Sequence, residues 1–170
     1  MCTEELHNVS FPLITSEGYK YIINFERVDL VQFSEEVAGK TDVPVYDLNF
    51  KLYGANISDI EINNPKTLYR IGAIILDFLI ENDVIIYYFC DTKQIKKGKK
   101  HEHISHQEFR HMLFTTMYRY VATRRQLDNF ENNALEITGE NEKYYLHFLC
   151  SQKNLTYVKI LLAEFEKYNK

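Results

Sequence analysis

The most distinctive chemical feature of this 170-residue chain is a run of positive charge in its second half. Residues 93 to 125 hold nine lysine and arginine side chains against two glutamates, a net charge of +7. The rest of the chain holds eleven cations and twenty-two anions, a net charge of −11. The nine cations are Lys93, Lys96, Lys97, Lys99, Lys100, Arg110, Arg119, Arg124 and Arg125. We therefore expect an electrically polar molecule that attracts anions locally.

The first part of this segment is a loop that leads into a helix. Ser105 and Glu108 have the Ser-x-x-Glu spacing of a capping box, so the helix is expected to begin there with free backbone N–H groups. Histidines that gain charge below about pH 6.5 would strengthen the attraction for an anion. The predicted anion-binding surface comprises Lys96, Lys97, Lys99, Lys100, His103, His106 and Arg110. The alternative is a solvated loop, because runs of charge are common on protein surfaces.

Clustered histidines raise the question of a metal site. His101, His103, His106 and His111 lie close together in the sequence, and neutral imidazole is a good ligand for zinc or nickel. No two of the four are separated by four residues, which would place a pair on one face of a helix, and no cysteine joins them. We therefore predict neither a metal site nor a cofactor.

Cys90 ends an apolar run that starts at Val84, and Asp91 follows it directly. A thiol at this position could be a nucleophile if a histidine of the following loop lay against it. The pattern is more typical of a buried structural cysteine followed by an aspartate that forms a turn. No catalytic residue is therefore assigned.

Composition and length indicate a single globular domain over residues 1–170, with 45% apolar and 26% charged residues and no linker rich in proline, glycine or serine. The net charge of −4 gives the whole molecule no attraction for nucleic acid or anionic lipid. The chain begins without the pattern of an export signal, and its longest apolar runs are shorter than the roughly 18 residues that a membrane span needs. Three cysteines, an odd number, are interpreted as reduced thiols. A cytoplasmic protein without a membrane partner is predicted, and its oligomeric state stays open.

Periodicity predicts the elements that position these residues. Alternation predicts strands at Tyr19–Arg27 and Val45–Tyr53, an optional short strand near Leu30–Phe33, a central strand at Val84–Cys90 and a hairpin over Leu135–Cys150. Helical spacing predicts helices that begin at Asn64-Pro65, at Ser105 and near Asn154, the second ending near Asn132-Asn133. The order ββ(β)αβαββα predicts an α+β fold: a mostly antiparallel sheet of about five or six strands, with two or three helices packed on one face.

Part of this pattern resembles a family of small bacterial proteins of unknown function, mainly from Bacteroidetes. The similarity lies in Ile71-Gly-Ala-Ile-Ile-Leu-Asp-Phe78 followed by Ile86-Tyr-Tyr-Phe-Cys-Asp91. In that family a helix leads to a strand that ends in Cys-Asp, then to a basic loop and a helix with a Phe-x-x-Trp-Phe pattern. Phe109-x-x-Met112-Leu113 stands in that last place here. The resemblance implies a fold and no activity.

Two functions fit these observations. The first is a non-catalytic interaction module whose basic surface binds an acidic protein or nucleic acid. The second is a small enzyme for a phosphorylated or nucleotide substrate, with Asp91 and a loop histidine as acid and base. An enzyme should bring Asp91, His103 or His106 and basic groups together in a concave pocket, whereas a binding module should display its cations on an open face. We favour the first.

Overall fold

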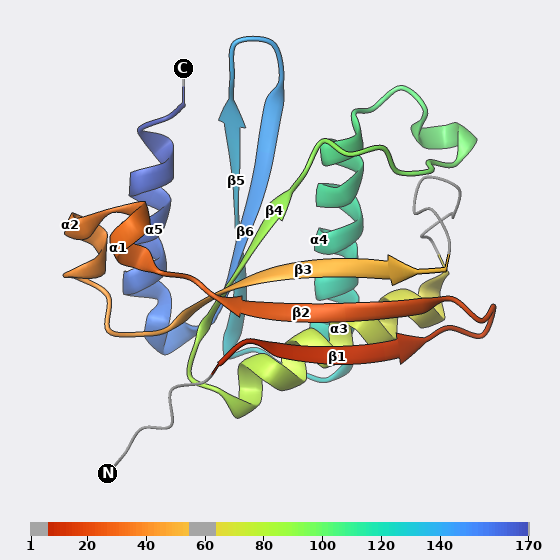
Figure 1. Ribbon diagram of the computed structural model, residues 1–170, viewed down its shortest axis with the longest axis horizontal. Helices are drawn as coiled ribbons and strands as arrows, with labels where there is room; N and C mark the ends of the chain where they lie inside the picture. Colours follow the sequence, from red (N-terminus) through yellow and green to blue (C-terminus); the bar gives the residue numbers. More distant parts are fainter. Residues whose placement is uncertain (1–6, 55–63, 170) are drawn as a thin grey trace.

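A computed structural model describes residues 7–54 and 64–169 of the chain. Its centre is one six-stranded sheet with the order β1-β2-β3-β4-β6-β5, in which only β3 and β4 are parallel neighbours (Figure 1). The strands are β1 (Val9–Ile14), β2 (Lys20–Arg27), β3 (Val45–Tyr53), β4 (Ile85–Cys90), β5 (Phe130–Thr138) and β6 (Lys143–Ser151). The predicted α+β fold with a mostly antiparallel sheet of five or six strands is confirmed.

Helices connect β2 to β3, β3 to β4 and β4 to β5, and one more follows β6. They are α1 (Leu30–Phe33), α2 (Glu35–Ala38), α3 (Pro65–Glu81), α4 (His106–Arg124) and α5 (Leu155–Glu166), with short 3-10 turns η2 (Lys99–His101) and η3 (Gln152–Asn154). Capping side chains begin the two longest helices as the sequence predicts. The side chain of Asn64 accepts a hydrogen bond from the Lys66 N–H, and that of Ser105 accepts one from the Glu108 N–H.

Two predicted boundaries are wrong. Leu30–Phe33 is a helical turn instead of a strand, because the Asp29 carboxylate accepts a hydrogen bond from the Val31 N–H and caps it. The helix α4 ends at Arg124 rather than near Asn132-Asn133. The chain reverses at Gln126, whose φ of 55° is left-handed, and both asparagines lie in β5.

Helices cover both faces of the sheet, which corrects the expected one-sided arrangement. Ile85 and Ile86 are adjacent in the central strand β4 and completely buried on opposite faces, since successive strand residues alternate. Ile86 packs in the core beneath α3 and α4, and Ile85 packs in the core beneath α5. Figure 1 shows α5 standing apart from α3 and α4 beside the β5–β6 hairpin. The continuous apolar run of β4 therefore reflects burial on both sides.

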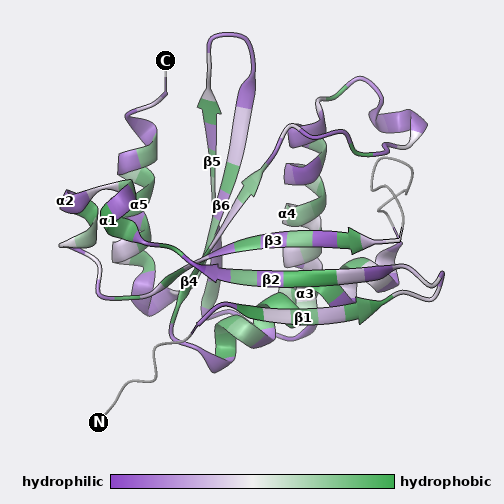
Figure 2. Ribbon diagram, viewed as in Figure 1, coloured by the Kyte–Doolittle hydropathy of each residue, from purple (hydrophilic) through white to green (hydrophobic). Residues whose placement is uncertain are grey.

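The strands β1 and β2 and the second half of β3 are covered on one face only. Their uncovered face carries a polar ladder in which Ser10 Oγ donates to Asn24 Oδ1 at 2.6 Å and Asn24 Nδ2 donates to Asn49 Oδ1 at 2.9 Å. The intervening residues are apolar and face the core, so hydrophilic and hydrophobic positions alternate along these strands in Figure 2. No helix within residues 7–54 and 64–169 is long and apolar enough to cross a membrane.

Gly72 sets the distance between α3 and α4. A Cβ at this position would lie 2.8 Å from Val121 Cγ2 and 2.9 Å from Met117 Cγ, both closer than real contacts. We expect Gly72→Ala to lower the free energy of unfolding by about 1–2 kcal/mol, because overpacking outweighs the gain in helix propensity. Gly39 is the control, since its φ is negative and a Cβ there would meet only ordinary contacts at 3.6 Å. Urea unfolding would measure the stability of both alanine variants. Equal free energies of unfolding for Gly72→Ala and Gly39→Ala would contradict this prediction.

Candidate anion-binding loop and adjoining pocket

The loop between β4 and α4, residues 91–105, displays the predicted cations. Lys93, Lys96, Lys99, Lys100 and His103 are exposed, and the loop is largely hydrophilic in Figure 2. None of these four lysines forms an ion pair with another described residue. They are therefore available to an external anion. We call Lys93, Lys96, Lys99, Lys100 and His103 the loop cations.

Arg110 holds the base of this loop from inside. Its side chain is 9% exposed, and Nη1 donates to the backbone carbonyls of Asp91, at 3.0 Å, and Lys93. Its Nη2 lies 3.4 Å from Asp91 Oδ1, which also accepts from the Lys93 N–H at 3.0 Å. The guanidinium thus joins the end of β4 to the first turn of the loop.

Two further contacts fix the rest of the loop. Lys97 Nζ donates to the carbonyl of Ile104, and Ile95 is buried while its N–H donates to His106 Nδ1 at 3.2 Å. Burial, followed by the nearby charges of Lys97 and Arg110, lowers the pKa of His106, which suits its role as a neutral acceptor. The loop is therefore an internally bonded structure.

The seven residues of the predicted anion surface are divided by these contacts. Lys96, Lys99, Lys100 and His103 face outward, whereas Lys97, His106 and Arg110 are engaged with the loop itself. Arg110, a member of the predicted anion-binding surface, is buried instead of facing outward. The buried face of α4 runs through Arg110, Phe114, Met117 and Val121, while Met112 and Tyr120 are 39% and 48% exposed. Arg110 lies four residues before the apolar Phe114, a spacing that puts both on one helix face and could have predicted the burial of Arg110.

The +7 segment does not form one continuous surface. Arg119, Arg124 and Arg125 lie toward the far end of α4, and the helix is about 28 Å long at 1.5 Å per residue. Arg125 pairs with Asp77, and Arg124 donates to the Tyr120 hydroxyl at 2.9 Å. Only the loop cations remain as a local group.

The four clustered histidines separate in space. His101 packs against Phe109, with ring centroids 5.4 Å apart, and His106 bonds to the loop backbone. His111 Nδ1 lies 3.0 Å from Nε2 of His147, which comes from β6, 36 residues away. No group of three or more potential metal-ligating side chains was found among the described residues.

His147 is a completely buried histidine that the sequence analysis did not single out. Its Nδ1 lies 2.9 Å from Asn132 Oδ1, which can only accept, so Nδ1 carries the proton and Nε2 accepts from His111. Phe114 packs against the imidazole at a centroid distance of 4.7 Å. Burial, followed by repulsion from His111, lowers the pKa of His147 to about 3. The sequence signal for this buried histidine was its position within the apolar run of β6.

Cys90 and Cys150 are buried free thiols, while Cys2 lies outside the described residues. Burial is the largest effect that raises the pKa of the Cys90 thiol to about 12. A thiol with this pKa is protonated at neutral pH and is a poor nucleophile. Cys90 therefore fits the interpretation as a buried structural cysteine rather than a nucleophile.

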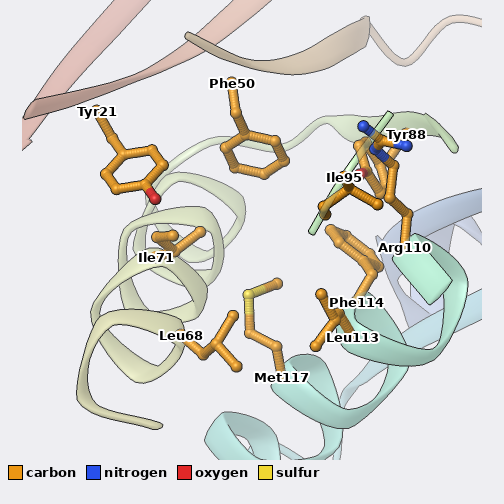
Figure 3. A pocket seen from close by; sticks show the side chains of 10 residues that line it. All are labelled: Tyr21, Phe50, Leu68, Ile71, Tyr88, Ile95, Arg110, Leu113, Phe114 and Met117. Atoms are coloured by element: carbon orange, nitrogen blue, oxygen red, sulfur yellow. The ribbon is translucent and has the colours of Figure 1, made fainter. Parts of the chain in front are cut away.

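A small pocket adjoins the loop (Figure 3). Its wall consists of Tyr21, Phe50, Leu68, Ile71, Tyr88, Ile95, Arg110, Leu113, Phe114 and Met117. The cavity measures about 80 Å³, well below the roughly 300–1,000 Å³ typical of small-molecule sites. Asp91, His103 and His106 do not belong to its lining. The groups of the enzymatic alternative therefore do not converge in this pocket.

Comparisons with known proteins found no protein-family model, curated protein or solved structure that matches this chain.

Proposed function

We propose that this protein is a non-catalytic interaction module whose loop cations bind an acidic segment of a partner protein. The observation that carries the proposal is that some basic side chains of this region bond to the loop backbone while others are exposed to solvent. Arg110, Lys97 and His106 hold the backbone, while the loop cations point outward without ion pairs inside the described ranges. A preordered loop loses little entropy when an anion binds, which favours recognition.

Charge distribution favours an acidic protein segment over nucleic acid. The chain outside residues 93–125 carries a net charge of −11, so a long polyanion that extended beyond the loop would be repelled. The loop contains no phenylalanine, tyrosine or tryptophan on which unpaired bases could stack. A short acidic peptide needs only the local positive charge.

A charge-reversal series tests this function. The test variant replaces Lys96, Lys99 and Lys100 with glutamate, and the control variant reverses Lys20, Lys51 and Lys159, which are also exposed, on β2, β3 and α5. Both variants have the same net charge, so the overall field changes equally. Fluorescence anisotropy would measure binding of a ten-residue polyglutamate peptide and a ten-nucleotide single strand.

The wild-type protein should bind the peptide more tightly than the nucleic acid, and its affinity should fall steeply with salt, because screening acts within about 8 Å at physiological ionic strength. Reversal of the loop lysines should weaken binding by at least about tenfold, a loss of 1.4 kcal/mol. The control reversal should weaken it far less. Equal losses of affinity in the two variants would show that only net charge matters and would contradict the proposal. Tighter binding of the single strand would identify nucleic acid as the partner instead.

A further inference from the structure

A second cavity lies on the other side of the sheet, between the strands β3 and β4 and the helices α1 and α5. It measures about 230 Å³, almost three times the volume of the pocket beside the loop. Four aromatic side chains line it: Phe33, Tyr87, Phe148 and Phe165. Figure 1 shows α1 lying beside α5, where Phe33 and Phe165 meet with ring centroids 4.8 Å apart.

Asp47 is the one charged residue among the described residues that line this cavity. It lies on β3 directly opposite Tyr87 of β4 and Glu26 of β2. Within residues 7–54 and 64–169 its carboxylate has neither a hydrogen bond nor an ion pair, although it is only partly exposed. Burial, followed by repulsion from Glu26, raises the pKa of Asp47 to about 6. An ionised carboxylate in these surroundings lacks a countercharge.

We propose that this cavity binds an organic cation, an ammonium group carried on an apolar body. The negative faces of aromatic rings attract ammonium groups, most strongly where water is excluded. The Asp47 carboxylate adds the countercharge, and the neighbouring aliphatic walls accept the apolar part of the ligand. This site is independent of the loop cations, whose charge has the opposite sign.

Choline and 3,3-dimethylbutan-1-ol are suitable probes, because they have the same shape and differ in the charge of the central atom. Chemical-shift changes of backbone amides would report binding to the full-length protein. We expect saturable choline binding that shifts residues around Asp47 and Phe165, with the uncharged alcohol at least about tenfold weaker. Equal binding of the two probes, binding elsewhere or no choline binding would overturn the proposal.

Asp47→Asn and Glu26→Gln form a matched pair of variants. Both remove one carboxylate from the same region of the sheet, but only Asp47 lines the cavity. Asp47→Asn should weaken choline binding by at least about fivefold and Glu26→Gln by less than about twofold, since only Asp47 is a direct partner in a partly desolvated site. Phe33→Leu is a second test, which should weaken choline more than the alcohol. Unchanged choline affinity in Asp47→Asn would contradict the assignment.

The ammonium group could belong to a small molecule or to a methylated lysine of another protein. A short neutral peptide with one trimethyllysine distinguishes these sources. A peptide that binds more tightly than choline would identify a protein side chain as the ligand, and the reverse order would identify a small molecule.

Discussion

Lowering the pH from 7 to 4 should remove about 3 kcal/mol of unfolding free energy through His147 alone. Its pKa is lowered to about 3 in the folded protein, against about 6.5 in the unfolded chain. Between these values the unfolded chain binds a proton that the folded protein excludes. Stability is therefore fully present above pH 6.5 and is lost as the pH falls toward 3.

Asp47 opposes this effect and must be removed to measure it. Its pKa is raised to about 6 in the folded protein, against an ordinary aspartate pKa of 3.8. As the pH falls from about 6 to 3.8, protonation of Asp47 therefore favours the folded protein. Asp47→Asn should be more stable than wild type at pH 7, because it removes a desolvated carboxylate repelled by Glu26. In this background, stability should fall continuously with acid.

Urea unfolding from pH 7 to 4 would compare Asp47→Asn with the double variant Asp47→Asn/His147→Phe. The double variant should be less stable at pH 7, because Asn132 and His111 lose their partner, but its stability should vary much less with pH. His111→Gln in the same background keeps a donor for His147 and should retain most of the slope. An equally steep acid loss in the double variant would exclude His147 as its source.

Arg110→Met should lower the free energy of unfolding by about 2–4 kcal/mol and release the anion-binding loop. Methionine preserves the alkyl packing beside Phe114, but it leaves the carbonyls of Asp91 and Lys93 without their donor and Asp91 without its ion partner. Because Arg110 is a positioning residue, its loss should weaken binding of the polyglutamate peptide without removing a contact to that peptide.

Arg119→Met is the matched control, since Arg119 is exposed on the same helix and should contribute less than about 0.5 kcal/mol. Limited trypsin digestion would locate the released segment, with cleavage after Lys93 to Lys100 expected to accelerate only in Arg110→Met. Wild-type protection of these sites in Arg110→Met would show that other contacts hold the loop.

Local patterns in the sequence were sufficient for most elements. Asn64 and Ser105 mark their helices because a cap needs only the next three residues of the chain. The alternation of β3 and the continuous apolar run of β4 likewise predicted both strands, although not the helices that cover β4 on its two faces. The strand β1 was missed because Pro12 lies inside it, and proline is tolerated there only because β1 is an edge strand.

The functional groups depended on contacts between distant segments. The sequence determined that positive charge gathers around residues 93–125, but the tertiary structure decided that Arg110 and Lys97 turn inward while Lys96 and Lys99 turn outward. It also joined His111 to His147. It likewise placed Asp47 of β3 in one cavity lining with the aromatic rings of α1 and α5. Charge and periodicity are properties of a local segment, whereas burial and hydrogen-bond partners depend on which segments the folded sheet brings together.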